Sequence, residues 1–406
     1  YKERINFTNR IFHLASEYVI DKDERHIVNT RLNGFWTSST LIYDNNIQSS
    51  YAYRSIIGLT VDSTKGSALY MGRVNLDRVI FKGISNSHIA NIWNGVLKKC
   101  QFLNSCTWTS NVNPLMMWDS SSVEDCIFDG LVFHDRILHV VLPIRQEVSF
   151  KRNKFINNIP MTSWNRMVWV EGNGKMTFAN NLIIDKSYNQ AYGFHWSGSA
   201  TTDSVYVLNN TFIGGRIALW INSNGLGNFI IENNLFSPYS IGPNNGLANT
   251  FSRLLYLDGT GTGTVWMRFR NNHFDTSSGF ALKLIPNINY IDTTGSKNNW
   301  GSKIDFIDPS TNNYALKSNS RDIGSGTIIP KSLNGSFDIL GKSRIQPAGT
   351  NTDLGAFENS AGFPCPTLVT AEGGNKKITV TYSQFAVTGL KKYKLYRSTK
   401  PISDTA

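Results

Sequence analysis

The stretches FKRNKF (residues 150–155), FANNLI (178–183), VLNNTF (207–212), IENNLF (231–236) and FRNNHF (269–274) decide the fold of this chain. Each begins and ends with an apolar residue and carries asparagine at its fourth position. Three earlier copies, LDRVIF (76–81), LKKCQF (97–102) and VEDCIF (123–128), have valine or cysteine there. The copies recur every 21 to 38 residues. A phrase that repeats with such a period predicts a solenoid with one coil for each copy.

The fourth position of the phrase is expected to form one interior column along the solenoid. Its members are Val79, Cys100, Cys126, Asn153, Asn181, Asn210, Asn234 and Asn272. Equivalent residues of neighbouring coils lie about 4.8 Å apart, so stacked amides can hydrogen-bond from coil to coil. A buried amide without partners is costly, and the column removes that cost. Cys100 and Cys126 would be close enough for a disulfide, but we expect stacked free thiols.

The segments between the phrases indicate a β protein. They are rich in Gly, Asn, Ser and Thr and show no sustained period of 3.6 residues. On the ladder phrases, residues from about 55 to 300 resemble the pectin-lyase-like superfamily of right-handed parallel β-helices. The resemblance implies an all-β, right-handed parallel β-helix of about nine or more coils, with about nine of them between residues 55 and 300.

The end of the solenoid carries a second resemblance. The segments DFIDPSTNNYALKSNSRDIGSG (305–326), DILGKSR (338–344) and TDLGAFE (352–358) resemble the closing segment of secreted bacterial β-helix proteins of the choice-of-anchor type. We expect Asp322, Asp353 and Glu358 to tie irregular backbone into a cap over the last coil, which would block the open sheet edge. The resemblance implies a secreted or cell-surface location.

The sequence changes character again at residue 366. PTLVTAEGGNKKITVTY and KKYKLYRSTKPISDTA read as two alternating strands, with a turn at Gly373 and Gly374. They resemble the first strands of a fibronectin type III domain, with Tyr382 where that family usually has tryptophan. We assign residues 1–361 to the β-helix, with 1–54 as N-terminal coils or cap and 302–361 as the capping segment. Residues 362–406 are assigned to the start of an incomplete fibronectin type III-like domain.

Composition limits the partners. The chain has 40 Lys and Arg against 29 Asp and Glu, a formal net charge of +11, which favours polyanions. No run of five or more basic residues marks a nucleic-acid-binding tail. We therefore expect an anionic polysaccharide or cell-surface glycan and no nucleic acid. The sequence has no apolar stretch approaching 18 residues and no CxxC pair, so we expect no membrane span and no zinc site. The oligomeric state is left open.

A second strand in each coil is where chemistry could lie. These strands begin PLMMWDS (114), RILHVVL (136), RMVWVEG (166), AYGFHWSG (191), RIALWINS (216) and RLLYLDG (253). Aligned on their starts, alternation places one set of side chains outward and another, Val168, Val170, Leu255 and Leu257, in the core. The outward set is His139, Trp169, Phe194, Leu219 and Tyr256, with Asp119, Glu171 and Asp258 at the far end. In AYGFHWSG, either Phe194 with Trp196 or His195 could point outward.

Such a face suits a charged sugar chain, because aromatic rings stack on pyranose faces and arginines hold carboxylate or sulfate. The residues expected to bind substrate are Arg136, Trp169, Trp196, Trp220, Tyr256, Asp258 and Asp119. The competing interpretation is that the aromatic residues belong to the core. The sequence GTGTGT (259–264) indicates a loop in the longest coil that could wall a groove.

Two catalytic schemes remain open. A lyase needs a base beside a uronate whose charge is neutralised, with His139, His195 or Tyr256 as base and Arg136, Arg166, Arg216 or Ca²⁺ as neutraliser. A glycoside hydrolase needs two carboxylates, for which Asp119, Glu171 and Asp258 are available.

The residues that we expect to be catalytic are His139, Arg166, Glu171, His195 and Arg216. The vWiDH and RxPxxRxG phrases of pectate lyases are absent, as is the Lys and Arg motif of the chondroitinase B and alginate lyase relatives. The leading hypothesis is a carbohydrate-active β-helix that binds, and in its stronger form cleaves by β-elimination, an anionic polysaccharide. The alternative is a non-catalytic adhesin or fibre module.

Overall fold

The structure is a computed structural model of the 406-residue chain. It describes residues 5–6, 12–34, 40–44, 54–85, 88–107, 113–133, 136–143, 146–157, 165–186, 191–198, 204–215, 217–223, 227–237, 253–258, 265–275, 281–284, 290–292, 298–334, 336–344, 351–359, 369–374 and 377–382.

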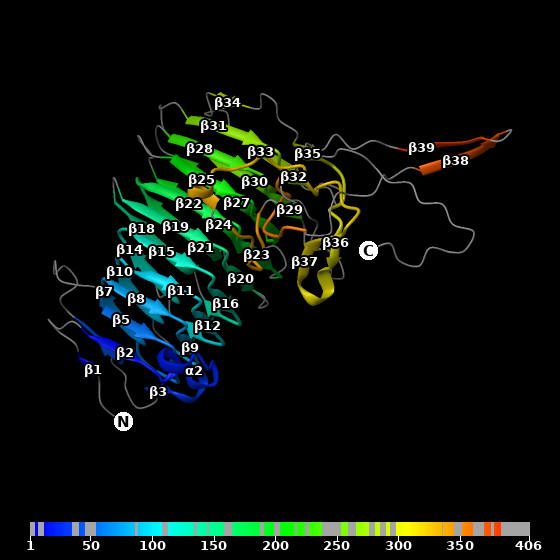
Figure 1. The fold of residues 1–406 in the computed structure, drawn as a ribbon. Helices are drawn as coiled ribbons and strands as arrows, with labels where there is room; N and C mark the ends of the chain where they lie inside the picture. Colours follow the sequence, from blue (N-terminus) through cyan, green and yellow to red (C-terminus); the bar gives the residue numbers. More distant parts are fainter. Residues whose placement is uncertain are drawn as a thin grey trace, which may run out of the picture.

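Three parallel sheets wind together into a solenoid with little helix (Figure 1). Sheet A contains β1 (Ile5–Asn6), β4 (Ile42–Tyr43), β7 (Leu69–Gly72), β10 (Ala90–Trp93), β14 (Leu115–Trp118), β18 (Arg136–Leu142), β21 (Asn165–Gly172), β24 (Ala191–Gly198), β27 (Ile217–Ser223), β30 (Arg253–Asp258) and β33 (Ala281–Leu284). Sheet B contains β2 (His13–Ala15), β5 (Arg54–Ile57), β8 (Val74–Asp77), β11 (Val96–Lys98), β15 (Ser121–Glu124), β19 (Glu147–Lys151), β22 (Lys175–Ala179), β25 (Ser204–Leu208), β28 (Gly227–Glu232), β31 (Val265–Arg270) and β34 (Tyr290–Asp292). Sheet C contains β3 (Arg31–Asn33), β6 (Thr60–Asp62), β9 (Ile80–Lys82), β12 (Gln101–Leu103), β16 (Ile127–Asp129), β20 (Lys154–Asn157), β23 (Leu182–Asp185), β26 (Thr211–Gly214), β29 (Leu235–Ser237), β32 (His273–Phe274) and β35 (Asn299–Trp300).

The predicted all-β parallel solenoid is therefore confirmed. Each strand pairs in parallel with the equivalent strand of the next coil, as the one-coil-per-phrase period requires. Each sheet has eleven strands over residues 5–300, a longer span than the residues 55 to 300 for which about nine coils were predicted. Two short helices, α1 (Tyr18–Asp21) and α2 (Arg25–Asn29), lie beside the first coils (Figure 1). A small additional parallel pair joins β13 (Cys106–Thr107) to β17 (Val132–Phe133).

The repeated six-residue phrase forms the corner between sheet B and sheet C, and the geometry of that corner explains its residues. The third residue of the phrase has a left-handed backbone in all eight copies, with φ between 51° and 60° (Arg78, Lys99, Asp125, Arg152, Asn180, Asn209, Asn233 and Asn271). Asparagine tolerates this conformation better than most residues with a side chain. In the Asn–Asn pairs of the later coils, the first asparagine makes the turn and the second enters the core. The two adjacent asparagines therefore have separate physical causes.

The interior asparagine column is confirmed. Each Asn side chain donates from Nδ2 to Oδ1 of the next asparagine at 2.9–3.2 Å, from Asn153 through Asn272. The same Oδ1 atoms accept a backbone N–H from the preceding coil at 2.8–3.0 Å. The column also continues to Asn298, which sequence analysis missed because no full phrase surrounds it. All five predicted asparagines are fully buried, so every amide replaces its lost water contacts with protein partners.

The early coils fill this column differently. Cys100 and Cys126 are buried free thiols, as predicted, and burial raises the pKa of Cys126. The thiol of Cys100 lies 3.6 Å from the carbonyl oxygen of Leu76 in the preceding coil, the position that an asparagine amide uses elsewhere. The last position of the phrase makes a second stack, from Phe81 through Phe102 and Phe128 to Phe155, with ring centroids 4.6–5.0 Å apart.

The segment after the last coil lies elsewhere than predicted. It contains β36 (Phe306–Asp308), the 3-10 turn η1 (Pro309–Thr311), β37 (Asn313–Leu316) and the short helix α3 (Lys331–Asn334). Instead of covering the end of the solenoid, it packs on the outward face of sheet C (Figure 1). There its apolar residues bury Leu182, Ile184, Ile213 and Leu235. Both faces of β23, β26 and β29 are apolar, so the outward face also needs a cover.

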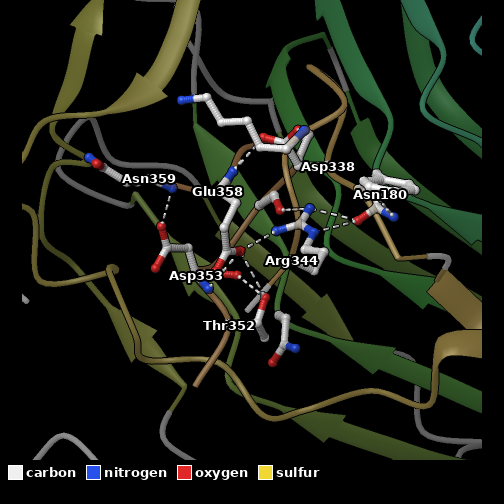
Figure 2. A network of polar contacts seen from close by, with 12 residues as sticks. Asn180, Asp338, Arg344, Thr352, Asp353, Glu358 and Asn359 are labelled. Carbon is white, nitrogen blue, oxygen red and sulfur yellow. Dashed lines mark hydrogen bonds and ion pairs between the residues drawn. The ribbon is translucent and has the colours of Figure 1, made fainter. Parts of the chain in front are cut away.

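Buried polar contacts hold this cover (Figure 2). Arg344 donates to Asn180 Oδ1 at 2.6 Å and to Glu358 Oε2 at 3.2 Å. Asp353 accepts backbone N–H groups from Gly324 and Asn359, both at 2.7 Å. Burial, with a smaller contribution from the nearby Glu358, raises the pKa of Asp353 to about 7. The predicted role of Asp353 and Glu358 in tying irregular backbone is confirmed, on a different face of the solenoid.

The C-terminal region supports only part of the prediction. β38 (Val369–Gly374) and β39 (Lys377–Tyr382) form an antiparallel hairpin. Gly373 and Gly374 pair with Ile378 and Lys377, so the glycines end the strand and the connection follows them, contrary to the turn predicted at the glycines. The next predicted strand, residues 393–398, lies outside the described residues.

Candidate functional site

The outer face of sheet A is set by the register of its strands. His139 pairs with Trp169, Trp169 with His195, His195 with Trp220 and Trp220 with Tyr256. The predicted outward positions of Phe194 and Leu219, and the binding role of Trp196, are wrong because all three side chains are fully buried. Ala191 pairs with Asn165 and not with Arg166. Alignment on the strand starts was therefore one residue out, which exchanges the two faces.

Two arginines from successive coils converge on one indole. The guanidinium carbon of Arg136 lies 3.9 Å from the ring centroid of Trp169, and that of Arg166 lies 4.6 Å from it. Arg166 also lies 5.9 Å from the ring of Trp220 and 6.0 Å from that of Tyr192. Such contacts hold a guanidinium in place over the ring through its face. Sequence analysis missed Tyr192, because of the same alignment error.

Histidine rings fill the spaces between these aromatic residues. His139 stacks on Trp169 at 4.8 Å, Trp169 lies 5.8 Å from His195, and His195 lies 3.9 Å from Trp220. We call Arg136, His139, Arg166, Trp169 and His195 the arginine–histidine cluster. Both faces of the Trp169 ring are in contact with members of the cluster. Little of the ring face is therefore left for a sugar, which argues against the predicted stacking role of Trp169.

Hydrogen bonds fix the histidine tautomers. Arg166 Nε donates to His195 Nδ1 at 2.8 Å, so the proton of neutral His195 sits on Nε2, which has no hydrogen-bond partner among the described residues. His139 Nε2 lies 3.2 Å from Glu171 Oε2 and donates to it. His139 Nδ1 is buried, also with no such partner in the described part of the chain. Neither ring presents an accessible lone pair to a substrate.

Electrostatics keep both histidines neutral. Burial, followed by the charges of Arg136 and Arg166, lowers the pKa of His139 to about 3. Burial and the same two arginines lower the pKa of His195 to about 3. An efficient general base has a pKa near the working pH. The predicted base role of these histidines therefore finds little support in the unbound state, whereas a bound anion would offset the arginine charges and raise both pKa values.

The carboxylates do not form a facing pair in the described structure. Asp119 Oδ2 accepts from Asn94 Nδ2 at 3.3 Å, toward the preceding coil, and Glu171 is engaged by His139. Asp119 directly follows β14 and Glu171 lies in β21, and these strands lie two coils apart. Asp258 pairs through its backbone with Asn222, but the side chains of Tyr256 and Asp258 lie outside the described residues. Arg216 lies outside them as well.

A further aromatic group precedes the cluster on sheet A. Tyr43 stacks on Tyr70 at 5.4 Å, Tyr70 lies 4.9 Å from Trp93, and Trp93 stacks on Trp118 at 6.0 Å. All four are half-buried on the outer face. Sequence analysis identified the strand that contains Trp118 but did not identify this row of four stacked aromatic rings. The signal was present in the alternation of ALYMG (68–72) and ANIW (90–93).

A His–Asp–Ser arrangement outside sheet A has a structural role. His273 Nδ1 lies 2.8 Å from both oxygens of Asp322, and Nε2 lies 3.0 Å from Ser302 Oγ. The same Nε2 lies 2.9 Å from the Ser302 carbonyl oxygen and 3.3 Å from Asn299 Nδ2. Nε2 is therefore shared among several polar groups of the last coils and is not directed at the Ser302 hydroxyl alone, as a catalytic triad would require. His273 joins the cover segment to the last coils, which accounts for Asp322.

Comparisons with family models, curated proteins and solved structures find no match to this chain. Within the described ranges, no group of three or more His, Cys, Asp or Glu could hold a metal ion. In the same part of the chain, no helix is long and apolar enough to cross a membrane. The parallel β-solenoid thus stands on the structure, and membership of the pectin-lyase-like superfamily stays a prediction.

Proposed function

We propose that the outer face of sheet A binds an anionic polysaccharide through Arg136 and Arg166. The observation that carries this proposal is the pair of guanidinium groups held 3.9 and 4.6 Å from the same indole. Arginine matches carboxylate and sulfate with paired N–H donors. Ligand groups attached at intervals to a chain can engage arginines from successive coils, and the net charge of +11 favours their approach.

His195 adds a neutral donor to this face. Because Arg166 occupies Nδ1, the proton of the neutral ring lies on Nε2, on the other side of the ring. The His195 residue is only 3% exposed, and its Nε2 atom is buried. The ring also lies between Trp169 and Trp220, so a sugar oxygen would reach this donor only after the ring moves outward.

Cleavage by β-elimination is the stronger form of the proposal. It would use the arginines to stabilise the charge that develops on a uronate carboxyl, and a base role of His139 or His195 would require a rearrangement that exposes a ring nitrogen to the substrate. The alternative is a non-catalytic surface protein in which the same face only binds. Absorbance of unsaturated products near 235 nm distinguishes the two when the protein is incubated with alginate, polygalacturonate, chondroitin sulfate and heparin. The paired-carboxylate hydrolase finds less support, because Asp119 and Glu171 bond in different directions.

The binding experiment measures the affinity of the chain for polygalacturonate and heparin at about 50 and about 500 mM NaCl, since such binding weakens steeply with salt. The double variant Arg136→Gln, Arg166→Gln should lose roughly tenfold or more in affinity for two charge-assisted contacts.

Its control, Arg25→Gln with Lys98→Gln, removes the same charge from exposed positions on α2 and β11. The control variant should lose little affinity for polygalacturonate or heparin. Equal losses in both variants would indicate unspecific attraction and overturn the site.

A further inference from the structure

Next to the arginine–histidine cluster, the outward side chains of sheet A change from large aromatic rings to a short valine. Trp93 and Trp118 come from successive coils and stack at 6.0 Å with their planes 4° apart. Their ring faces therefore point along the solenoid. On the other side of Trp118 its register partner is Val141, and the partner of Val141 is Glu171.

Val141 is too short to cover an indole face. Strands of neighbouring coils are about 4.8 Å apart, so the Trp118 and Glu171 positions are separated by roughly 10 Å across the valine. We call the stretch formed by Trp118, Val141 and Glu171 the Trp118 step. Val141 is only half-buried and Glu171 is exposed. The Trp118 side chain is fixed, since Nε1 donates to Asn91 Oδ1 at 3.1 Å.

We propose that the Trp118 step accepts one uncharged pyranose ring of the polysaccharide whose acidic neighbour is held by Arg136 and Arg166. This inference rests on the proposed function and names the kind of sugar chain. One ring face would stack on Trp118, above Val141, and a hydroxyl or amide would donate to the outer oxygen of Glu171. The carboxylate of Glu171 repels a uronate at this position, which selects a neutral sugar.

Charge on the neighbouring coils agrees with this choice. The outward residues of β7, β10 and β14 on this face are Tyr70, Asn91, Trp93, Met116 and Trp118, none of which is charged. The arginines begin one coil later, in β18 and β21. Both guanidinium groups lie over Trp169, which is two residues from Glu171 along β21. Two residues of a parallel strand span roughly 7 Å, a distance comparable with one sugar residue. The preferred ligand is therefore a polymer in which uronate alternates with a neutral sugar.

The test compares two classes of polymer. Hyaluronan and unsulfated chondroitin alternate a uronate with a neutral amino sugar, whereas polygalacturonate and alginate contain uronates alone. At equal salt, the parent protein should bind the alternating polymers more tightly. Trp118→Ala should remove that preference with a loss of about tenfold for the alternating polymers, as expected for one lost stacking contact. Val141→Trp, which fills the step, should do the same without removing a wild-type contact.

Two controls separate the failures. Trp266→Ala removes a 53% exposed tryptophan on β31 of sheet B and should change nothing. Arg136→Gln with Arg166→Gln should weaken both polymer classes. If that double variant weakens binding while Trp118→Ala and Val141→Trp do not affect the preference, the step is wrong and the arginine site stands. If the parent protein binds no polymer of either class, both proposals fall.

Discussion

Asn181, Asn210 and Asn234 occupy the same corner in three successive coils, whereas the outer face of sheet A carries Trp169, His195 and Trp220 in those coils. Inside, each residue is the hydrogen-bond partner of its own kind, so the best neighbour for an asparagine is another asparagine. Outside, Trp169 holds arginines and His195 accepts a bond from one. Repetition therefore marks structure in this chain, and the proposed binding face is where that repetition is lost.

The largest expected effect breaks the interior column. Asn210→Ala removes an amide that bonds to Asn234, to the Phe178 carbonyl and to the Asn181 N–H. We expect the free energy of unfolding to fall by roughly 3 kcal/mol, because buried partners lose their bonds. Chemical denaturation measures this loss. Asn228→Ala, at an exposed position of β28, is the matched control. A loss below about 1 kcal/mol would show that the column contributes little.

The contrast between the interior column and the outer face of sheet A also decides how much of the structure could be predicted from the sequence. The column, the corner and the sheets follow from eight copies of one phrase, since a pattern repeated in every coil can be read without knowing distances. The face of sheet A could be read only in part. His139 and Trp169 were placed outward correctly, but a one-residue slip in RIALWINS put Leu219 outward in place of Trp220, and AYGFHWSG left open whether Phe194 with Trp196 or His195 faces outward.

The remaining features depend on distance in space. The contact of Arg136 and Arg166 with one indole joins residues 30 positions apart, and no local pattern encodes it. The site of the cover segment depends on a second apolar face of sheet C, which alternation rules assign to solvent. Leu182, Ile184 and Leu235 show that a strand covered on both faces gives no alternation to read.

The second prediction uses pH, to which the amide column does not respond. His139 and His195 have folded pKa values of about 3 against about 6.5 in an unfolded chain. A lowered pKa means that their contribution is present above pH 6.5 and is lost as the pH falls toward 3. His139→Gln with His195→Gln should flatten this part of the stability profile by roughly 2.5 kcal/mol between pH 7 and 5.5. Denaturation across pH measures it, and an unchanged slope would contradict the buried neutral rings.

The third prediction concerns the cover segment, where stability should change with pH in the opposite direction. The pKa of Asp353 is raised to about 7 from about 3.9 when unfolded. Its contribution is therefore full below about pH 4 and is lost as the pH rises toward 7. Asp353→Asn should be less stable than the parent protein at acidic pH by roughly 1 to 2 kcal/mol, because an amide N–H would face a backbone donor. The gap should narrow toward pH 8, whereas exposed Asp305→Asn should show no such trend. A gap that widens with pH would contradict an Asp353 that folds in its protonated form.

The last prediction, with the smallest expected effect, asks whether the interior column has the same geometry in the early coils as in the later ones. Cys126 stands where the later coils have asparagine, and its backbone N–H already donates to Asn153 Oδ1 at 2.9 Å. The Cys100 thiol approaches the Leu76 carbonyl, as the Asn153 amide approaches that of Val123. Cys126→Asn should therefore extend the column by one member and change the free energy of unfolding by less than about 1 kcal/mol, since new bonds offset a slightly larger side chain. Cys126→Leu, whose side chain has the same branching and number of heavy atoms as asparagine but no amide, should lose more, because it adds volume with no new bonds. If both variants are equally destabilised, the early coils are narrower than the later ones, and valine and cysteine stand there for lack of room.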